Sequence, residues 1–184
     1  MAEAGATEAA AAKTSDEREL MADSPSKPNP LHELTARLAA GELAEIPPGT
    51  VVHPPGGLFD VFGIELTHVG PGSARAQMKV RQVHLNQRGV VQGGAIVALA
   101  DAAAGWASYT TLPDPQFTTL DLSCNLTGPA RDGALLVATA TPVHLGRRTQ
   151  VLDVTVQDVA RATANPGRGL VARFSCTQLV LSAR

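Results

Sequence analysis

A single carboxylate stands inside a long apolar stretch of the sequence. Between Arg88 and Asp114 the only charged residue is Asp101, and most of its neighbours are alanine, glycine or branched aliphatic residues. A carboxylate in a buried helix loses hydration, so it persists where it is paired, hydrogen-bonded or used in chemistry. Asp101 is therefore a candidate catalytic residue. The alternative is a partly solvated structural aspartate at the rim of a sheet, or one bonded to a neighbouring backbone amide.

Two glycines open the same stretch. In Gln92-Gly93-Gly94, backbone N–H groups without side chains lie at the positive end of the predicted helix dipole. A substrate oxygen that develops negative charge can approach such groups closely. Paired glycines also shape a tight corner between a loop and a helix, so they indicate a site only in combination with Asp101.

The spacing of these two features has a consequence for assembly. Gly93 and Asp101 are eight residues apart, which corresponds to about 12 Å along a helix axis. Both groups would have to act within about 3 Å of one reacting carbon, which one chain does not easily achieve. Two such helices running antiparallel across a two-fold axis would bring Gly93 of one copy near Asp101 of the other. We therefore expect a homodimer at minimum, with two equivalent sites.

The helix that carries Asp101 is predicted over residues 93–111 and ends before Pro113. Apolar residues cover all its sides, which predicts a buried helix. Small residues recur along it and leave one face flat enough for a sheet or a second helix to approach closely: Ala95, Ala98, Ala102 and Gly105.

Strands are predicted on both sides of this helix. Residues 62–69 and 74–80 alternate in polarity and are joined by Gly70-Pro71-Gly72, which indicates a hairpin. Four more strand-like runs follow the helix, at about residues 117–127, 134–144, 148–158 and 170–181. Two strands, one long helix and four strands predict an α+β fold, in which an antiparallel sheet wraps around one central helix.

The chain divides into three predicted parts. Residues 1–28 have few large apolar groups and predict a disordered N-terminal tail. Residues 29–57 predict a short helix, capped by Asn29 and reaching Gly41, followed by an irregular crossing segment rich in proline and glycine. Residues 58–184 form the single predicted catalytic domain.

Charge and composition limit the partners and the compartment. The formal net charge of −2 at pH 7 argues against nucleic acid or an anionic membrane as a partner. No signal peptide and no membrane-spanning run is recognised. Cys124 and Cys176 lie in alternating apolar segments, where reduced, buried thiols are expected, so a soluble cytoplasmic protein is predicted.

Several segments together resemble a known family. Residues 86–101, NQRGVVQGGAIVALAD, resemble the signature of the phenylacetate-type acyl-CoA thioesterases of the hot-dog superfamily. Residues 62–66 with the following Gly-Pro-Gly turn resemble the first hairpin of that family, and residues 119–130 resemble the strand after its helix. Residues 144–148 resemble its later coenzyme A loop. The likeness covers about residues 58–182 and implies the hot-dog fold.

The resemblance implies roles for four residues. Asp101 would attack the thioester directly or act as general base on water, and the Gly93 N–H would polarise the thioester carbonyl. Asn86 would orient substrate or water, and Thr119 would help to place the hydrolytic water. A threonine in an alternating strand is also ordinary strand composition. His84 remains a further candidate because it is close to Asn86 in the sequence.

The resemblance also implies a substrate-binding set. Arg147 and Arg148 would reach the phosphates of coenzyme A, although adjacent arginines on a hairpin are commonly a solvated turn. Thr149 and Gly94 complete this set. No metal and no cofactor is expected, since coenzyme A is part of the acyl-CoA substrate. The expected assembly is a homodimer or a dimer of dimers.

One position departs from the family pattern. The family usually has His-Gly-Gly where this chain has Gln92-Gly93-Gly94. Glutamine donates hydrogen bonds but does not titrate near neutral pH, so a proton-transfer role of that histidine is lost. The alternative function is therefore a non-catalytic acyl-CoA-binding or scaffolding protein on the same fold.

Overall fold

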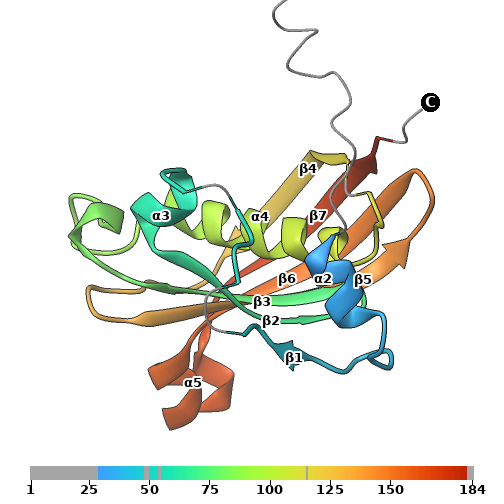
Figure 1. Ribbon diagram of the computed structural model, residues 1–184. Coiled ribbons are helices and arrows are strands. Elements are labelled where there is room, and N and C mark those ends of the chain that lie inside the picture. Colours follow the sequence, from blue (N-terminus) through green and yellow to red (C-terminus); the bar gives the residue numbers. More distant parts are fainter. Residues whose placement is uncertain (1–28, 48–49, 54, 115, 182–184) are drawn as a thin grey trace, which may run out of the picture.

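A computed structural model describes residues 29–47, 50–53, 55–114 and 116–181 of the chain (Figure 1). The tail predicted over residues 1–28 lies outside the described residues. One antiparallel sheet of seven strands, in the order β1-β2-β3-β5-β6-β7-β4, forms the body of the molecule. The strands are β1 (Ala44–Glu45), β2 (Ile64–Gly70), β3 (Ser73–Lys79), β4 (Phe117–Leu126), β5 (Leu135–Leu145), β6 (Thr149–Asp158) and β7 (Leu170–Val180).

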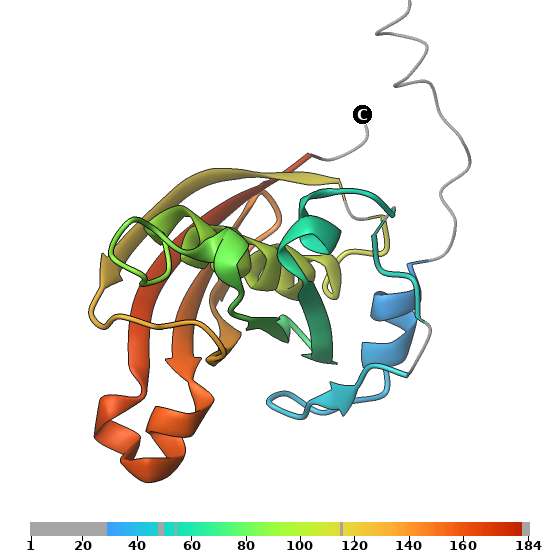
Figure 2. The same ribbon diagram turned by 90° about the vertical axis from the view of Figure 1, so that its left-hand side faces the viewer.

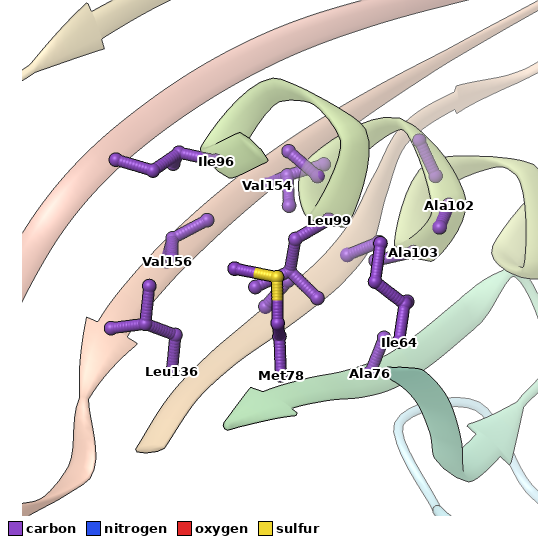
Figure 3. Packing of buried hydrophobic residues seen from close by; sticks show 14 of the residues in the cluster. Ile64, Ala76, Met78, Ile96, Leu99, Ala102, Ala103, Leu136, Val154 and Val156 are labelled. Carbon is purple, nitrogen blue, oxygen red and sulfur yellow. The ribbon is translucent and has the colours of Figure 1, made fainter. Parts of the chain in front are cut away.

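The long helix α4 (Gly93–Tyr109) crosses the concave face of this sheet, which curves around it (Figure 2). Its inner side packs on side chains of β2, β3, β5, β6 and β7, as Figure 3 shows for Leu99 of α4 beside Met78 of β3 and for Ala103 of α4 beside Ile64 of β2. All four side chains are buried. Burial of this apolar surface fixes α4 against the sheet and so fixes the position of Asp101. No helix in the described part of the chain has the length and apolar character needed to cross a membrane.

The predicted hot-dog architecture is confirmed. The hairpin at Gly70-Pro71-Gly72 joins β2 and β3, and the four strand-like runs after the helix are β4 to β7, each within about two residues of its predicted bounds. The helix predicted over residues 93–111 is α4. Because the expected strand runs carry the alternation of one buried face, sequence periodicity locates them well.

Four short elements depart from the prediction. The strand expected from Phe62 begins at Ile64, because α3 (Leu58–Phe62) ends at Gly63, whose positive φ of 63° stops the helix. The helix expected to reach Gly41 is shorter than predicted and ends at Thr35, as α2 (Pro30–Thr35). Strand β1 pairs with β2 inside the segment predicted as irregular. Helix α5 (Val159–Ala164), in the β6–β7 connection, projects away from α4 (Figures 1 and 2).

Asn29 joins two helix ends with one side chain. Its Oδ1 accepts hydrogen bonds from the backbone N–H groups of Leu31 and His32 at the start of α2, so Asn29 caps this helix as predicted. Its Nδ2 donates to the carbonyls of Tyr109 and Leu112 at the end of α4, over 2.7 and 2.8 Å. The same amide therefore holds α2 against the C-terminal end of α4.

Strand β4 lies at one edge of the sheet. It pairs with β7 along one side, and in the sheet order no described strand lies on its other side. Eight of its ten residues are exposed, among them Leu120 and Leu126, which are 57% and 52% exposed. Cys124 is exposed as well, so the burial predicted for this thiol is wrong. A long, exposed apolar edge strand is a template for pairing with another chain.

Candidate active site

Asp101 lies about halfway along α4, on a side of the helix that is not fully covered by the sheet. Along this side Gly94, Val97, Asp101 and Gly105 keep contact with solvent, whereas Leu99 and its neighbours on the sheet side are buried. Ten of the seventeen residues of α4 are buried, in agreement with the predicted buried helix, and this side stays partly open in a single chain. The open stripe makes Asp101 accessible to a substrate or to a second subunit.

Thr119 brings a hydroxyl to the Asp101 carboxylate. Its Oγ1 donates a hydrogen bond of 2.9 Å to Oδ1 of Asp101, from β4 to α4 across 18 residues of sequence. No ion pair to Asp101 occurs among the described residues. A carboxylate that accepts one neutral hydrogen bond and keeps its other oxygen open can still accept a proton or attack an electrophile.

A bulge in β4 determines which side chain meets Asp101. Leu122 faces Cys176 of β7 and Thr119 faces Gln178, but the register shifts between Thr119 and Asp121. The extra residue is Leu120, which points into solvent. In an unbulged strand that alternates from Leu122, Leu120 would hold the inner position opposite Gln178. The bulge replaces this leucine with the Thr119 hydroxyl.

Two buried polar side chains continue from Thr119 into the sheet. Oε1 of Gln178 lies 3.2 Å from the Thr119 hydroxyl, and Nε2 of Gln178 lies 3.2 Å from Sγ of Cys176. Both residues are 0% exposed. Burial, and secondarily the negative charge of Asp101, raises the pKa of the Cys176 thiol to about 11, so the thiol is neutral near pH 7.

The N-terminus of α4 presents free backbone donors. Gln92 is the N-cap residue and its side chain makes no capping hydrogen bond. Among the described residues, no acceptor is bonded to the N–H of Gly93 or Gly94. A Cβ added at Gly93 would lie 3.0 Å from Cδ1 of Leu126, whereas one added at Gly94 would meet open space. Gly93 is thus the tighter position, beside the edge strand.

Asn86 and Gln92 lie together beside this helix start. They line an open cavity of about 380 Å³ together with Leu85, Gln87 and Arg88. Oδ1 of Asn86 accepts a hydrogen bond of 2.9 Å from the backbone N–H of Arg88, which closes the turn that ends at Gly89. Among the described residues, the Asn86 amide nitrogen has no hydrogen-bond acceptor. Arg88 is a cation at this site that sequence reasoning did not select.

His84 supports the loop before α4 rather than offering a free imidazole. It is 1% exposed. Its Nδ1 accepts a hydrogen bond from the Arg81 backbone, and its Nε2 lies 3.0 Å from the carbonyl of Phe62. Burial lowers the pKa of His84, and the nearby Arg81 charge adds to this effect, against the opposing bond to Phe62. The neutral ring therefore holds the loop in place.

Arg147, Arg148 and Thr149 form the turn between β5 and β6. Both arginines are exposed, and the turn is closed by a bond from the Gly146 N–H to the Thr149 carbonyl. The next residue, Gln150, stands opposite Gln178 in the sheet register, and Gln178 stands opposite Thr119. The turn is thus close in register to Thr119, at the end of the sheet away from Leu126.

A larger cavity lies elsewhere in the molecule. It has a volume of about 580 Å³ and lies between residues 46–47 and 50–53, α3 and β2. Phe59, on its wall, packs its ring against Trp106 of α4, with ring centroids 5.0 Å apart. Its lining residues come from neither α4 nor β4, so it does not contain Asp101.

The predicted site residues form three groups. Asp101 bonds to Thr119, Asn86 and Gln92 line one cavity beside the helix start, and the Arg147–Thr149 turn lies two strands away from Thr119 in the sheet. Gly93 lies beside Leu126 and Asp101 beside Thr119, at different points along β4. No cluster of three His, Cys, Asp or Glu side chains suited to a metal ion occurs within the described ranges.

Comparison with known proteins identifies the family. A model of the thioesterase superfamily matches residues 88–164. The 1,4-dihydroxy-2-naphthoyl-CoA hydrolase of Listeria monocytogenes is 32% identical over 103 residues, which cover 55% of this chain and 83% of that protein. The chain belongs to the thioesterase superfamily and is a thioester hydrolase by class. The resemblance noted in the sequence is thereby confirmed.

Solved structures agree with this assignment. A mutant of the phenylacetic acid degradation protein PaaI from Thermus thermophilus is 32% identical, with a TM-score of 0.59, and the match covers 67% of this chain and 97% of that one. A Streptococcus mutans protein solved bound to acetyl CoA is 27% identical, with a TM-score of 0.58 and coverage of 73% and 94%.

Proposed function

We propose that the protein hydrolyses an acyl-CoA thioester to the free acid and coenzyme A, with Asp101 as the catalytic carboxylate. The observation that carries the proposal is the 2.9 Å hydrogen bond from Thr119 to Asp101 on the open side of α4. The similarity to a CoA-thioester hydrolase and to a protein bound to acetyl CoA supports the substrate class. Two free cysteines agree with the cytoplasmic location that we propose.

The chemistry has two forms that differ in what Asp101 does. As general base, Asp101 takes a proton from water while the water oxygen bonds to the thioester carbon, and the C–S bond then breaks to release the thiolate, which is protonated. As nucleophile, Asp101 bonds to that carbon itself, the C–S bond breaks to release the thiolate, which is protonated, and water then hydrolyses the resulting anhydride to the free acid and the regenerated carboxylate. In both forms the Gly93 N–H stabilises the carbonyl oxygen as its negative charge develops.

The site is proposed to be shared between two subunits. Asp101 is eight residues beyond Gly93, about 12 Å along α4, so these groups do not reach one carbonyl in a single chain. Strand β4 is an exposed edge strand that lies beside both residues. A second copy docked antiparallel along β4 would bring its Gly93 toward Asp101 of the first copy, and two such dimers would make the dimer of dimers expected from the sequence.

Coenzyme A is proposed to lie across exposed arginines. Arg147 and Arg148 on the β5–β6 turn, with Thr149 beside them, offer donors for its phosphates, and Gly94 offers a backbone N–H. Arg88 in the cavity beside Asn86 and Gln92 adds a further cation near the helix start. Asn86 is proposed to orient the substrate through its amide nitrogen.

The test of this function is a thiol-release assay on short, medium, long and aryl acyl-CoA substrates. Wild-type protein should release thiol from at least one of them, and Asp101→Asn should lower kcat by about a hundredfold or more. Retained activity in the variant contradicts the role of Asp101. Binding of acyl-CoA without thiol release would favour the alternative, a non-catalytic binding or scaffolding protein, to which the exposed Gln92 in place of the family histidine is also suited.

A mixing experiment tests the shared site. Asp101→Asn and Gly93→Pro chains should each be inactive alone. A mixed dimer would contain one site with both changes and one with neither. Unfolding and refolding an equal mixture should therefore restore about one quarter of the wild-type activity by random pairing. No recovery, with dimers present by light scattering, would place each site within one chain.

A further inference from the structure

The Thr119 hydroxyl has two acceptors and one proton. Its Oγ1 lies 2.9 Å from Oδ1 of Asp101 and 3.2 Å from Oε1 of Gln178. A hydroxyl donates one hydrogen bond only, so both contacts cannot be donated by Thr119 at the same time. The direction of the bond with Gln178 therefore decides whether the proton of Thr119 is available to Asp101.

The contact between the Gln178 amide and Cys176 determines how the amide is oriented. The amide atom on the side away from Thr119 lies 3.2 Å from Sγ of Cys176, and both side chains are fully buried among the inner residues of β7. The Cys176 thiol keeps its proton near neutral pH, so it can donate to an oxygen. An amide turned with its oxygen toward Cys176 presents its NH₂ group to Thr119. The thiol proton, one amide proton and the hydroxyl proton then each meet an acceptor in the row of polar groups that leads from Cys176 through Gln178 and Thr119 to Asp101.

We propose that Gln178 is a positioning residue, which donates a hydrogen bond to Oγ1 of Thr119. The Thr119 hydroxyl then donates its single proton to Asp101 and not to Gln178. Cys176 holds the amide in this orientation by donating its thiol proton to the amide oxygen. The row then runs in one direction, from Cys176 through Gln178 and Thr119 to the carboxylate. The ionised carboxylate is the stronger acceptor of the two that Thr119 faces, which favours this direction. The inference rests on the proposed role of Asp101.

The sheet contains a matched control for Gln178. Gln150 of β6 stands directly opposite Gln178 in the register and is 2% exposed. Its Nε2 donates to the hydroxyl of Thr111 over 2.7 Å, and it makes no bond to Thr119 or Asp101. The two glutamines therefore share residue type, burial and position across the sheet, but only Gln178 belongs to the row that ends at Asp101.

Steady-state kinetics test the positioning role. Gln178→Met keeps the length of the side chain and removes both ends of the amide. We expect kcat to fall about tenfold with KM nearly unchanged, because the lost bond aligns the reacting carboxylate rather than the substrate. Gln150→Met should stay within about twofold of the wild-type kcat, although both variants lose a buried hydrogen bond. Equal kcat values for the two variants, with both folded by urea unfolding, overturn the inference.

The infrared S–H stretch gives a readout that does not depend on activity. Cys124→Ala leaves Cys176 as the single thiol in the chain. A thiol that donates a hydrogen bond absorbs at lower wavenumber than one that does not. We expect a lowered band in Cys124→Ala and a shift to higher wavenumber when Gln178→Met is added.

The two readouts separate failure of the inference from failure of the proposed function. A band at the position of a non-donating thiol, unchanged by Gln178→Met, overturns the orientation of the amide even if the enzyme is active. A lowered band that responds to Gln178→Met, in a protein that releases no thiol, supports the amide orientation and contradicts the proposed hydrolysis instead.

Discussion

Thr119 stands opposite Gln178, in the position that Leu120 would hold if β4 were a regular strand. The bulge between Thr119 and Asp121 causes this, because it leaves Leu120 out of the register with β7. Exchange of the two residues, Thr119→Leu with Leu120→Thr, therefore keeps composition and strand propensity and turns the hydroxyl into solvent. We expect kcat to fall at least as far as in Thr119→Val. Wild-type activity in the exchanged chain would mean that β4 is regular in solution.

Loss of the hydroxyl alone should lower the rate with little change in stability. Thr119→Val removes the donor to Asp101 and keeps the branched shape that strands favour, so we expect kcat to fall roughly tenfold. Thr118, one position earlier, is exposed and faces the other side of the strand. Thr118→Val is the control and should keep wild-type kinetics. The measurement is kcat together with the urea midpoint of both variants.

Gly93 offers a way to remove one N–H without breaking the helix. Proline is accepted at the first helical position, and Gln92 already has the extended backbone, with φ of −64° and ψ of 135°, that precedes proline. Gly93→Pro and Gly93→Ala both place a Cβ near Leu126, but only proline lacks the N–H. We expect kcat to fall about a hundredfold more in Gly93→Pro. Equal rates would argue against this N–H as the oxyanion donor.

His84 should make stability depend on pH. Its folded pKa lies below the ordinary 6.5, mainly because of burial, so the unfolded state binds a proton first as the pH falls. The contribution to stability is present above about pH 6.5 and is lost as the pH falls through the lowered folded pKa. Urea unfolding across this window should show a flatter pH dependence for His84→Gln than for wild type. Identical slopes would contradict the assignment.

Asn29 should not tolerate the substitution that helix caps usually accept. At an ordinary N-cap, aspartate replaces asparagine with little loss, whereas alanine costs about 1 kcal/mol. Here aspartate would replace the Nδ2 donor by an oxygen facing two carbonyls at the end of α4. We therefore expect Asn29→Asp to lower the free energy of unfolding by about 2 kcal/mol, at least as much as Asn29→Ala. An aspartate variant as stable as wild type would contradict the double cap.

Cys176 should react with thiol reagents only when the protein unfolds. It is 0% exposed and its pKa is raised to about 11, so it offers neither access nor thiolate near neutral pH. In a Cys124→Ala protein, the rate of modification should rise with urea in parallel with unfolding. Rapid modification of the folded protein would show that the row beneath Thr119 is open to solvent.

Periodicity and turn residues were enough to predict the scaffold of this fold. The all-apolar run around Leu99 and the alternating runs on either side of it predicted α4 and six of the strands, because burial dictates residue type at these positions. Short elements escaped prediction. Two residues of β1 and five of α3 are too few to display a period, and their conformations depend on what they pack against.

The site was less accessible to sequence reasoning than the fold. Asp101 was recognisable because a charge in that context is costly. Thr119 could not be distinguished from ordinary strand composition. The side of β4 on which its side chain lies depends on a bulge, and no local pattern in the sequence indicates that bulge. Gln178 gave no signal at all, because a glutamine in an alternating strand is ordinary until its neighbours across the sheet are known.

The exposed edge of β4 has a kinetic consequence if each site is built from two chains. Dissociation by dilution would then remove whole sites rather than loosen them. At chain concentrations well below the dissociation constant of the pair, the total reaction rate would fall with the square of the protein concentration. For an enzyme whose site is complete in one chain, the total rate falls only in proportion to the protein concentration. The rate law under dilution would therefore report the molecularity of the active site.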